Sequence, residues 1–179
     1  MRSLLVGAIV CLQETKKPII DIAFIKSCYP KRFDKFAYIP SRGASGGLLT
    51  VWNSSLFSGT LIVQEDFSLG VQFTSTLSAQ PWSLYNIYGP CTGPARETFS
   101  QWLYDRDIHA DEDCLFLCDI NYIRGPENQN KAGGDVNDMS TFNDIIHKHN
   151  LVELPIKGRL YTWSNMQQDP LLKQLDWFF

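Results

Sequence analysis

The sequence predicts a single α/β domain, and three observations support this fold class. An apolar run over residues 115–118 ends abruptly at Asp119, as buried strands of α/β proteins do where they reach the edge of a sheet. Three segments rich in Thr, Val, Phe, Trp and Tyr follow one another between residues 56 and 88. Stretches with helical apolar spacing lie on either side of the 115–118 run. The 179 residues are 44% hydrophobic, which is enough to bury one core.

Composition limits the classes of partner and the compartment. The formal charge is −3, so the chain has no global basic field of the kind that nonspecific nucleic-acid binders often show. Any polyanionic partner must therefore bind a local patch. The five cysteines form no CxxC pair and lie mostly in apolar runs, which favours reduced thiols in an intracellular compartment.

The first twelve residues have the charge-then-apolar layout of a secretory signal. The apolar run is too short to cross a bilayer as a helix. The residues that follow it, Gln13-Glu14-Thr15-Lys16-Lys17, contain no small-x-small cleavage site. We therefore expect no signal peptide and no membrane association. Residues 8–12 instead predict a buried strand that ends near an acid, Glu14.

The first half of the chain predicts one helix followed by strands. Residues 19–28 have the apolar content of a helix that ends before Pro30. Short strands are expected at 36–40 and 48–52, separated by a glycine-rich loop that lacks the spacing of a phosphate-binding loop. The consecutive strands at 56–63, 68–77 and 82–88 are expected to pair antiparallel.

The second half returns to helices. An amphipathic helix is expected from Pro94 toward residue 108, and a second one contains Phe142, with Ser140 as its cap. The polar segment 125–138 between them predicts a long loop. Short strands are expected at the following ranges: 151–154, 161–163 and 175–179.

Polar side chains stand at the ends of several predicted strands: Glu14, Asn86, Tyr88, Asp119, Asn121 and Asp176. Asp119 and Asn121 are two residues apart and share one face of a strand, so both can point at one ligand, although an Asx turn would also explain Asp119. Carboxylates gathered with an amide and a phenol match the needs of phosphodiester cleavage assisted by Mg²⁺ or Mn²⁺.

Five motifs in order resemble the endonuclease/exonuclease/phosphatase (DNase I-like) superfamily. They are Val10-Cys11-Leu12-Gln13-Glu14-Thr15-Lys16, Asn86-Ile87-Tyr88-Gly89-Pro90, Leu117-Cys118-Asp119-Ile120-Asn121, Tyr161-Thr162-Trp163-Ser164-Asn165 and Leu175-Asp176-Trp177. The loop 40–47 and the stretch 151–155 before Gly158-Arg159 resemble most closely the endonuclease domain of plant LINE-type (non-LTR) retrotransposons.

The resemblance implies a four-layer α-β-β-α sandwich of two mixed sheets and a divalent-metal site that holds Mg²⁺ or Mn²⁺. It implies that Glu14 binds the metal and that Asp119 orients or deprotonates the attacking water. Asn121 and Tyr88 would contact the scissile phosphate, and Asp176 would hold a catalytic histidine in its working tautomer. DNA is the expected substrate.

The chain also departs from the family pattern. The Trp-Asn-x-x-Gly and Ser-Asp-His motifs that begin and end family members do not occur in it, so we expect a fold that is incomplete at both termini. Cys118 and Ile120 stand where Gly and Phe are usual. The three histidines, His109, His147 and His149, lie on helical segments and are expected to be surface residues.

Candidate DNA contacts are Lys16, Trp163 and Asn165. Lys16 and its neighbour Lys17, like Lys31 and Arg32, could line a DNA groove or be solvated loop charges, and tryptophans could stack on bases or pack in the core.

Three hypotheses for the function remain open. The chain is a retroelement DNA endonuclease acting in the nucleus, a phosphodiesterase or phosphatase on a small phosphorylated substrate, or a catalytically inactive retroelement fragment. The sequence does not indicate an oligomeric state.

Overall fold

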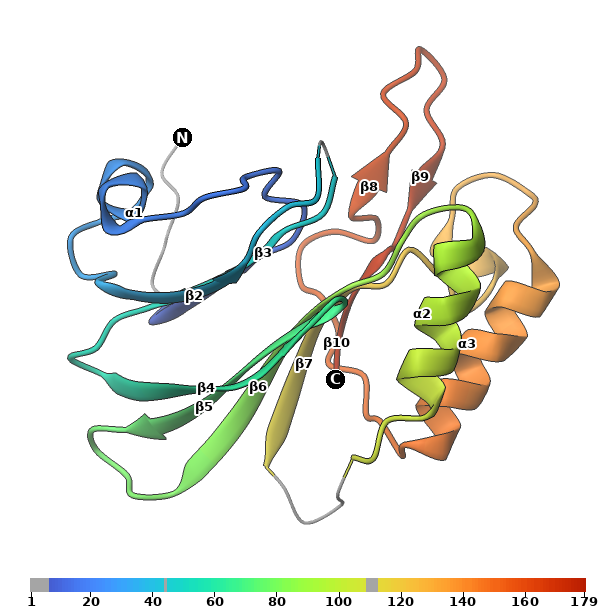
Figure 1. Cartoon of the computed structure of the whole chain (residues 1–179). Helices are drawn as coiled ribbons and strands as arrows, with labels where there is room; N and C mark the ends of the chain where they lie inside the picture. Colours follow the sequence, from blue (N-terminus) through green and yellow to red (C-terminus); the bar gives the residue numbers. More distant parts are fainter. Residues whose placement is uncertain (1–6, 44, 109–112) are drawn as a thin grey trace. The chain divides into compact units, whose positions relative to one another are not determined.

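The computed structural model describes residues 7–43, 45–108 and 113–179, and the chain divides into two compact units (Figure 1). Unit 1 comprises the chain up to Tyr88 together with the start of strand β7 (Cys114–Asp119), through Phe116. Unit 2 contains the rest of β7 and both of the longer helices. Within the described ranges no helix combines the length and apolar character needed to cross a membrane.

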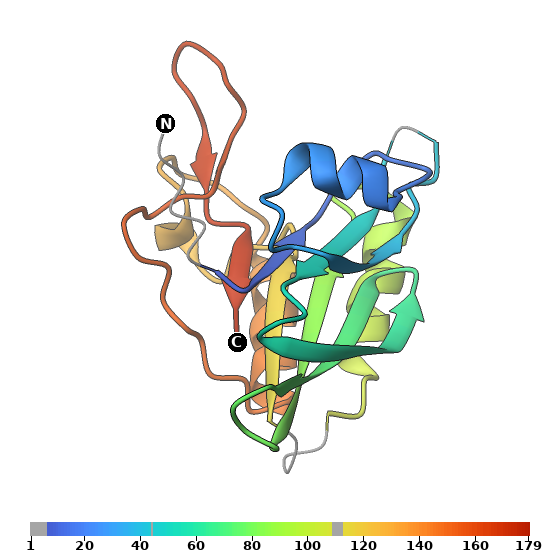
Figure 2. The same cartoon turned by 90° about the vertical axis from the view of Figure 1, so that its left-hand side faces the viewer.

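A three-stranded antiparallel sheet in unit 1 has the order β1 (Ile9–Leu12), β3 (Leu48–Trp52), β2 (Lys35–Ile39). All five residues of the central strand β3 are buried. Helix α1 (Ile22–Cys28) lies over this sheet (Figure 2), and a cluster that contains its Ile25 packs with two residues of β3, Leu49 and Val51. The cluster closes one face of the sheet, and the buried residues of β3 are apolar except for Thr50.

An antiparallel meander forms the other sheet of unit 1, from β4 (Phe57–Glu65), β5 (Ser68–Ser75) and β6 (Pro81–Tyr88). Phe73 of β5 is fully buried, and its ring meets that of Trp52 from β3 edge-on at 5.4 Å between centroids. The two sheets of unit 1 therefore pack face to face around aromatic side chains.

In unit 2, α2 (Pro94–Tyr104) and α3 (Val136–Lys148) lie side by side (Figure 1). They run parallel, because Arg96 pairs with Asp138 near both N-termini while Lys148 donates to the Tyr104 carbonyl near both C-termini.

The end of β7 in unit 2 pairs antiparallel with β10 (Asp176–Phe178). Phe142 of α3 meets the ring of Trp177 from β10 edge-on at 5.5 Å, and this contact forms the core of unit 2. The remaining elements are the short 3-10 helix η1 (Pro126–Asn128) and the hairpin of β8 (Trp163–Ser164) with β9 (Leu172–Lys173).

The α/β class with two main sheets and helices is confirmed, and so is the antiparallel pairing of the strands between 56 and 88. The strand at 48–52 has its predicted bounds. The first helix begins three residues later than predicted because Asp21 caps it, accepting from the Phe24 amide at 2.8 Å. The second helix ends at Tyr104, short of residue 108.

Other expectations were wrong. Helix α3 begins at Val136, and its cap is Asp135, which accepts from the Asn137 amide at 2.8 Å, rather than Ser140. Residues 151–154 form no strand; the Leu154 amide donates to the Phe178 carbonyl, but this bond is not part of a ladder. Strand β1 is only half-buried, with Leu12 41% exposed.

The five cysteines are all free thiols, but their environments differ. Cys28 and Cys91 are exposed, and Cys118 is buried on β7. Burial raises the pKa of the Cys11 thiol to about 12, against a smaller lowering by its hydrogen bond with Thr50.

We expect a thiol-alkylating reagent at pH 8 to modify Cys28 and Cys91 first. The raised pKa keeps Cys11 as a neutral, unreactive thiol at that pH, and Cys118 is inaccessible. Mass spectrometry of peptides after brief alkylation measures the order. Early modification of Cys11 would contradict the prediction, and full modification after denaturation serves as the control.

Phe73→Ala is expected to lower the free energy of unfolding by about 3–5 kcal/mol, because it leaves a cavity between the two sheets of unit 1. Denaturant unfolding followed by tryptophan fluorescence measures the change. Leu77→Ala is the matched control, since this side chain is 92% exposed and its loss should cost less than about 0.5 kcal/mol. Equal effects of the two substitutions would contradict the assigned core.

Candidate functional site

The predicted site residues fall into two groups, one in each unit. Glu14, Lys16 and Tyr88 belong to unit 1. Asp119, Asn121, Trp163, Asn165 and Asp176 belong to unit 2. The structure brings Glu14, Lys16 and Tyr88 together in unit 1 and Asp119 and Asp176 together in unit 2, while Trp163 and Asn165 lie on the β8–β9 hairpin.

In unit 1 the Tyr88 hydroxyl donates a hydrogen bond to Glu14 Oε1 at 2.7 Å. The Lys16 ammonium lies 3.6 Å from Glu14 Oε2, with both side chains about half exposed to solvent. The strand-end acid is thus held by a phenol on one oxygen and by a weak, solvent-screened ion pair on the other. A carboxylate in this setting remains accessible to a cation.

The backbone that presents Glu14 is strained. Glu14 and Lys16 both adopt left-handed conformations, with φ of 52° and 53°, which cost a non-glycine residue roughly 1–2 kcal/mol each. Two hydrogen bonds compensate: the Thr15 amide donates to the Gly47 carbonyl at 3.1 Å and the Lys16 amide donates to the Gly46 carbonyl at 3.0 Å. Strain of this kind persists only where surrounding structure imposes it, and it is concentrated at functional sites.

Gly47 is required at this contact. Its φ is 91°, and a Cβ atom there would lie 2.3 Å from Thr15 Oγ1. The glycine-rich loop that the sequence predicted to be only a turn therefore fixes the segment carrying Glu14. No sequence signal connected this loop to the acid, since the two are more than thirty residues apart.

Asn86, two residues before Tyr88 on β6, is fully buried. Its Oδ1 accepts from Gln13 Nε2 at 2.6 Å, and its Nδ2 donates to the carbonyls of Leu12 at 3.3 Å and Leu49 at 3.1 Å. The sequence placed Asn86 at a strand end without a role. In the structure its carboxamide joins β6 to β1 and β3.

In unit 2 the pairing of β7 with β10 places Asp119 directly opposite Asp176. Directly opposed residues of an antiparallel pair have Cβ atoms about 4.5–5.5 Å apart, and like charges in this arrangement are destabilising. Oδ1 of Asp119 is buried. Two carboxylates at one strand end are an arrangement that a cation or a hydrogen-bond donor stabilises.

Thr162 positions the start of β10, a role that sequence reasoning missed although Thr162 lies inside a quoted motif. Its Oγ1 accepts from the amides of Leu175 at 3.0 Å and Asp176 at 3.1 Å. The hydroxyl therefore fixes the backbone of one of the two opposed acids.

Asn121 is held at the end of β7 by Gly89. Its Nδ2 donates to the Gly89 carbonyl at 2.8 Å, and the Gly89 amide donates to the Asp119 carbonyl at 2.8 Å. A Cβ on Gly89 would lie 2.6 Å from the Ile120 carbonyl oxygen, so only glycine fits here. Asn121 itself has a φ of 59°, a conformation that asparagine tolerates better than most residues.

The two nucleic-acid candidates on the β8–β9 hairpin differ. Trp163 pairs with Lys173 and is 43% exposed, which leaves part of its ring available for stacking. Asn165 Oδ1 accepts from the amides of Gln167 at 3.3 Å and Leu171 at 3.0 Å. The side-chain oxygen of Asn165 therefore shapes the hairpin loop.

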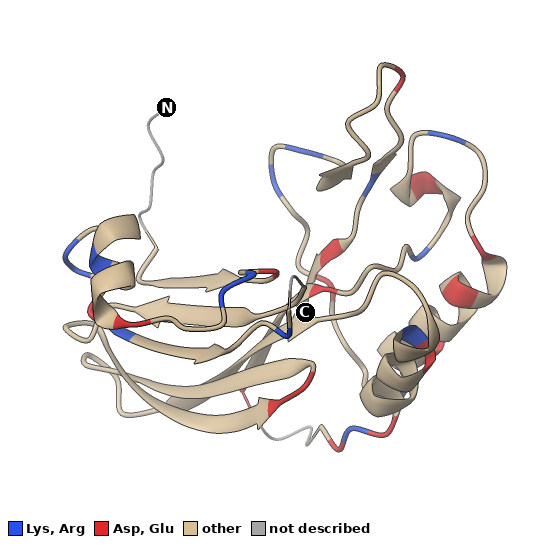
Figure 3. Cartoon of the chain, turned by 45° about the horizontal axis from the view of Figure 1, so that its top comes forward, with Lys and Arg blue, Asp and Glu red and all other residues tan. Residues whose placement is uncertain are grey.

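Charged residues do not gather in one place. Lys and Arg residues lie on α1, after β1 and on β9, with Asp and Glu residues among them (Figure 3). Lys17 lies over the ring of Phe24 and Arg32 over that of Phe33, at 5.7 and 5.1 Å, so both are engaged locally.

Two histidines lie at the C-terminal end of α3. His147 is exposed, and His149 Nε2 forms a hydrogen bond with the Leu103 carbonyl at 3.0 Å. His109 lies outside the described residues.

The donor atoms of the site suit a hard divalent cation. Mg²⁺ typically binds one or two protein carboxylates and takes its other ligands from water and substrate phosphates. Within unit 1 Glu14 offers one such carboxylate. Within unit 2 Asp119 and Asp176 offer a pair. Within the described residues, no group of three or more His, Cys, Asp or Glu side chains forms a complete metal cage.

No protein-family model matches the sequence, and no curated protein matches it by sequence. Solved structures do match by fold. The endonuclease domain of TRAS1, a telomere-specific non-LTR retrotransposon, aligns with a TM-score of 0.68 and 13% identity, over 97% of this chain and 73% of that one. The human Nocturnin catalytic domain with bound sulfate aligns with a TM-score of 0.51 and 13% identity, over 97% of this chain and 68% of that one. The chain therefore has the fold of the endonuclease/exonuclease/phosphatase, or DNase I-like, superfamily.

Proposed function

We propose that this chain is a metal-dependent phosphodiester hydrolase that cuts DNA, as an endonuclease of the non-LTR retrotransposon type. The observation that carries the proposal is the pair of opposed acids, Asp119 and Asp176, beside the fixed carboxamide of Asn121. The fold likeness to a retrotransposon endonuclease domain supports the choice of DNA as the substrate. In unit 1 the Glu14 carboxylate, held by the Tyr88 hydroxyl, is itself suited to a divalent cation.

Asp119 is proposed to hold the attacking water and to take up its proton. The water oxygen forms a new bond to phosphorus, one P–O bond of the diester breaks, and the departing sugar oxygen gains a proton from solvent. Asn121 uses one side-chain N–H on the Gly89 carbonyl, which leaves its second N–H to donate to a phosphate oxygen. Such a donor is most effective when charge builds up on the phosphate oxygens.

Glu14 is the proposed metal ligand, with the Tyr88 hydroxyl orienting its carboxylate. A bound Mg²⁺ or Mn²⁺ would supply Lewis-acid stabilisation of the phosphate charge. The family resemblance gives Asp176 the role of accepting a hydrogen bond from the histidine of the Ser-Asp-His motif, and this sequence does not contain that motif. Nuclear localisation is part of the proposal, since a retroelement nuclease acts on chromosomal DNA.

Asp119→Asn is expected to lower the rate of Mg²⁺-dependent nicking of supercoiled plasmid by about 10²–10⁴-fold, because the amide cannot accept the proton of the water. Gel quantification of nicked plasmid measures the rate. Asp66→Asn is the control, since Asp66 pairs with Arg42 on the surface and should leave the rate within twofold.

Equal nicking rates for the parent and Asp119→Asn would overturn the assignment of Asp119. A parent that does not nick with either Mg²⁺ or Mn²⁺ would favour the inactive fragment. A parent that spares plasmid but releases phosphate from inositol phosphates would favour the small-substrate phosphatase.

Tyr88→Phe is expected to raise the Mg²⁺ concentration for half-maximal nicking by about tenfold or more, because Glu14 loses the hydrogen bond that orients it. Nicking rates over a Mg²⁺ titration give the midpoint. Tyr104→Phe, which changes a partly exposed tyrosine on α2, is the matched control and should leave the midpoint unchanged. A Tyr88→Phe variant with an unchanged midpoint but a raised KM for DNA would show that Tyr88 acts on the phosphate alone.

A further inference from the structure

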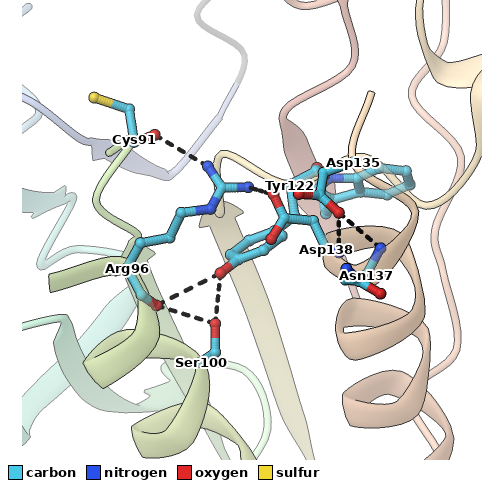
Figure 4. A network of polar contacts seen from close by, with 8 residues as sticks. Cys91, Arg96, Ser100, Tyr122, Asp135, Asn137 and Asp138 are labelled. Carbon is cyan, nitrogen blue, oxygen red and sulfur yellow. Dashed lines mark hydrogen bonds and ion pairs between the residues drawn. The ribbon is translucent and has the colours of Figure 1, made fainter. Parts of the chain in front are cut away.

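Arg96, on the first turn of α2, connects separate segments of unit 2 (Figure 4). Its Nη2 lies 2.7 Å from Asp138 Oδ2 on α3, and its Nη1 donates to the Cys91 carbonyl at 3.0 Å. The guanidinium lies over the ring of Tyr122, 3.8 Å from the centroid. One side chain thus contacts the loop before α2, the segment after β7 and the start of α3.

The partners of Arg96 are themselves fixed. The Tyr122 and Ser100 hydroxyls form a hydrogen bond at 2.6 Å, and Ser100 Oγ donates to the Arg96 carbonyl at 3.0 Å (Figure 4). Asp138 lies in the first turn of α3, where the cap residue Asp135 holds its amide at 3.4 Å. The groups around the guanidinium, Tyr122 and Asp138, are therefore held in place by hydrogen bonds of their own.

Burial strengthens these contacts. The Arg96 side chain is 21% exposed and Tyr122 is 5% exposed, so solvent screens the ion pair and the ring contact only in part. Nε of Arg96 is buried and makes no hydrogen bond with the described residues. In this orientation Nη1 and Nη2 donate to Cys91 and Asp138, and Nε is the donor that has no acceptor. A lysine ammonium is a point charge without the planar fork of a guanidinium, so it would not reproduce both contacts together with the stacking on Tyr122.

The contacts of Arg96 lead directly to Asn121. Cys91 is two residues after Gly89, whose carbonyl accepts from Asn121 Nδ2 and whose amide bonds to the Asp119 carbonyl. Tyr122 is the neighbour of Asn121 in the chain. Arg96 thus contacts both segments that the Gly89–Asn121 hydrogen bond joins, the first at Cys91 and the second at Tyr122.

We propose that Arg96 is a positioning residue for Asn121: by fixing the Cys91 carbonyl and the Tyr122 ring, it sets the direction of the Asn121 carboxamide. The proposal rests on the proposed function in one respect, the contact of Asn121 with the scissile phosphate. The network itself is a property of unit 2 and can be tested without activity.

Arg96→Lys keeps the positive charge but loses the two-pronged contact. We expect kcat for plasmid nicking to fall about ten- to hundredfold, with KM for DNA within twofold. A displaced Asn121 would reduce the stabilisation of the transition state more than it reduces the affinity for DNA. Arg106→Lys is the matched control, since Arg106 lies over the ring of Trp102 beyond the other end of α2. It should leave kcat unchanged.

A double-mutant cycle separates positioning from general stability. Asn121→Gly removes the carboxamide and accommodates the positive φ at that position. If Arg96 acts through Asn121, Arg96→Lys should change kcat less than twofold in the Asn121→Gly background. A full, additive loss in that background would overturn the proposal.

Hydrogen exchange tests the same inference independently of activity. Arg96→Lys should speed exchange of the Gly89 amide at least tenfold, while Arg106→Lys should not, as measured by NMR on the labelled full chain. Asp138→Asn, which removes the charge partner, is a second variant in case Arg96→Lys unfolds, and it should act in the same direction. Unchanged Gly89 exchange in folded variants would overturn the positioning role and leave the nuclease proposal standing. Faster exchange in a chain that never nicks DNA would support the positioning role and count against the nuclease alone.

Discussion

The buried carboxamide of Asn86 is the interaction on which the unit 1 part of the site depends. It joins β6 to β1 and β3 through four hydrogen bonds, and Asn86 itself is fully buried. Removing one partner of a buried polar group costs about 1–3 kcal/mol, so these hydrogen bonds hold the end of β6 against β1 and β3. Glu14 lies two residues beyond Leu12, and Tyr88 two beyond Asn86. Because these strand ends are held together, the Tyr88 hydroxyl reaches Glu14 Oε1 at 2.7 Å.

Much of the fold was predictable because local signals agreed with the tertiary structure. Strand β3 has its predicted bounds because Gly46 and Gly47 precede a run of β-favouring residues in which only Thr50 is polar. The start of α3 was not predicted correctly, because both Asp135 and Ser140 are residue types that cap helices. In the structure Asp135 is the cap, and it follows Gly133 and Gly134, which have positive φ. The predicted strand at 151–154 failed for a different reason: its residues have strand composition, but a single hydrogen bond to Phe178 does not make a ladder.

The candidate site divides in the same way. Strand-end acids were visible in the sequence because an apolar run that stops at a carboxylate is a local pattern, and the structure places Asp119 opposite Asp176. The roles of Gly47 and Arg96 depend on contacts between segments that are far apart in the chain, so no local pattern indicated them. Asn165 was a candidate DNA contact because it lies in a motif of the family resemblance, and that contact stays a prediction. The sequence did not indicate that its side-chain oxygen organises the hairpin backbone.

The left-handed backbone at Lys16 has a consequence for engineering and for evolution. Glycine adopts this conformation without steric cost, so Lys16→Gly would relieve the backbone strain. A screen for thermal stability alone would favour this substitution. The same replacement would remove the ammonium next to Glu14 and free the backbone beside it. Stability and the geometry of the acid are therefore in opposition at this position. Variants of this chain optimised only for robustness would be expected to lose the site first.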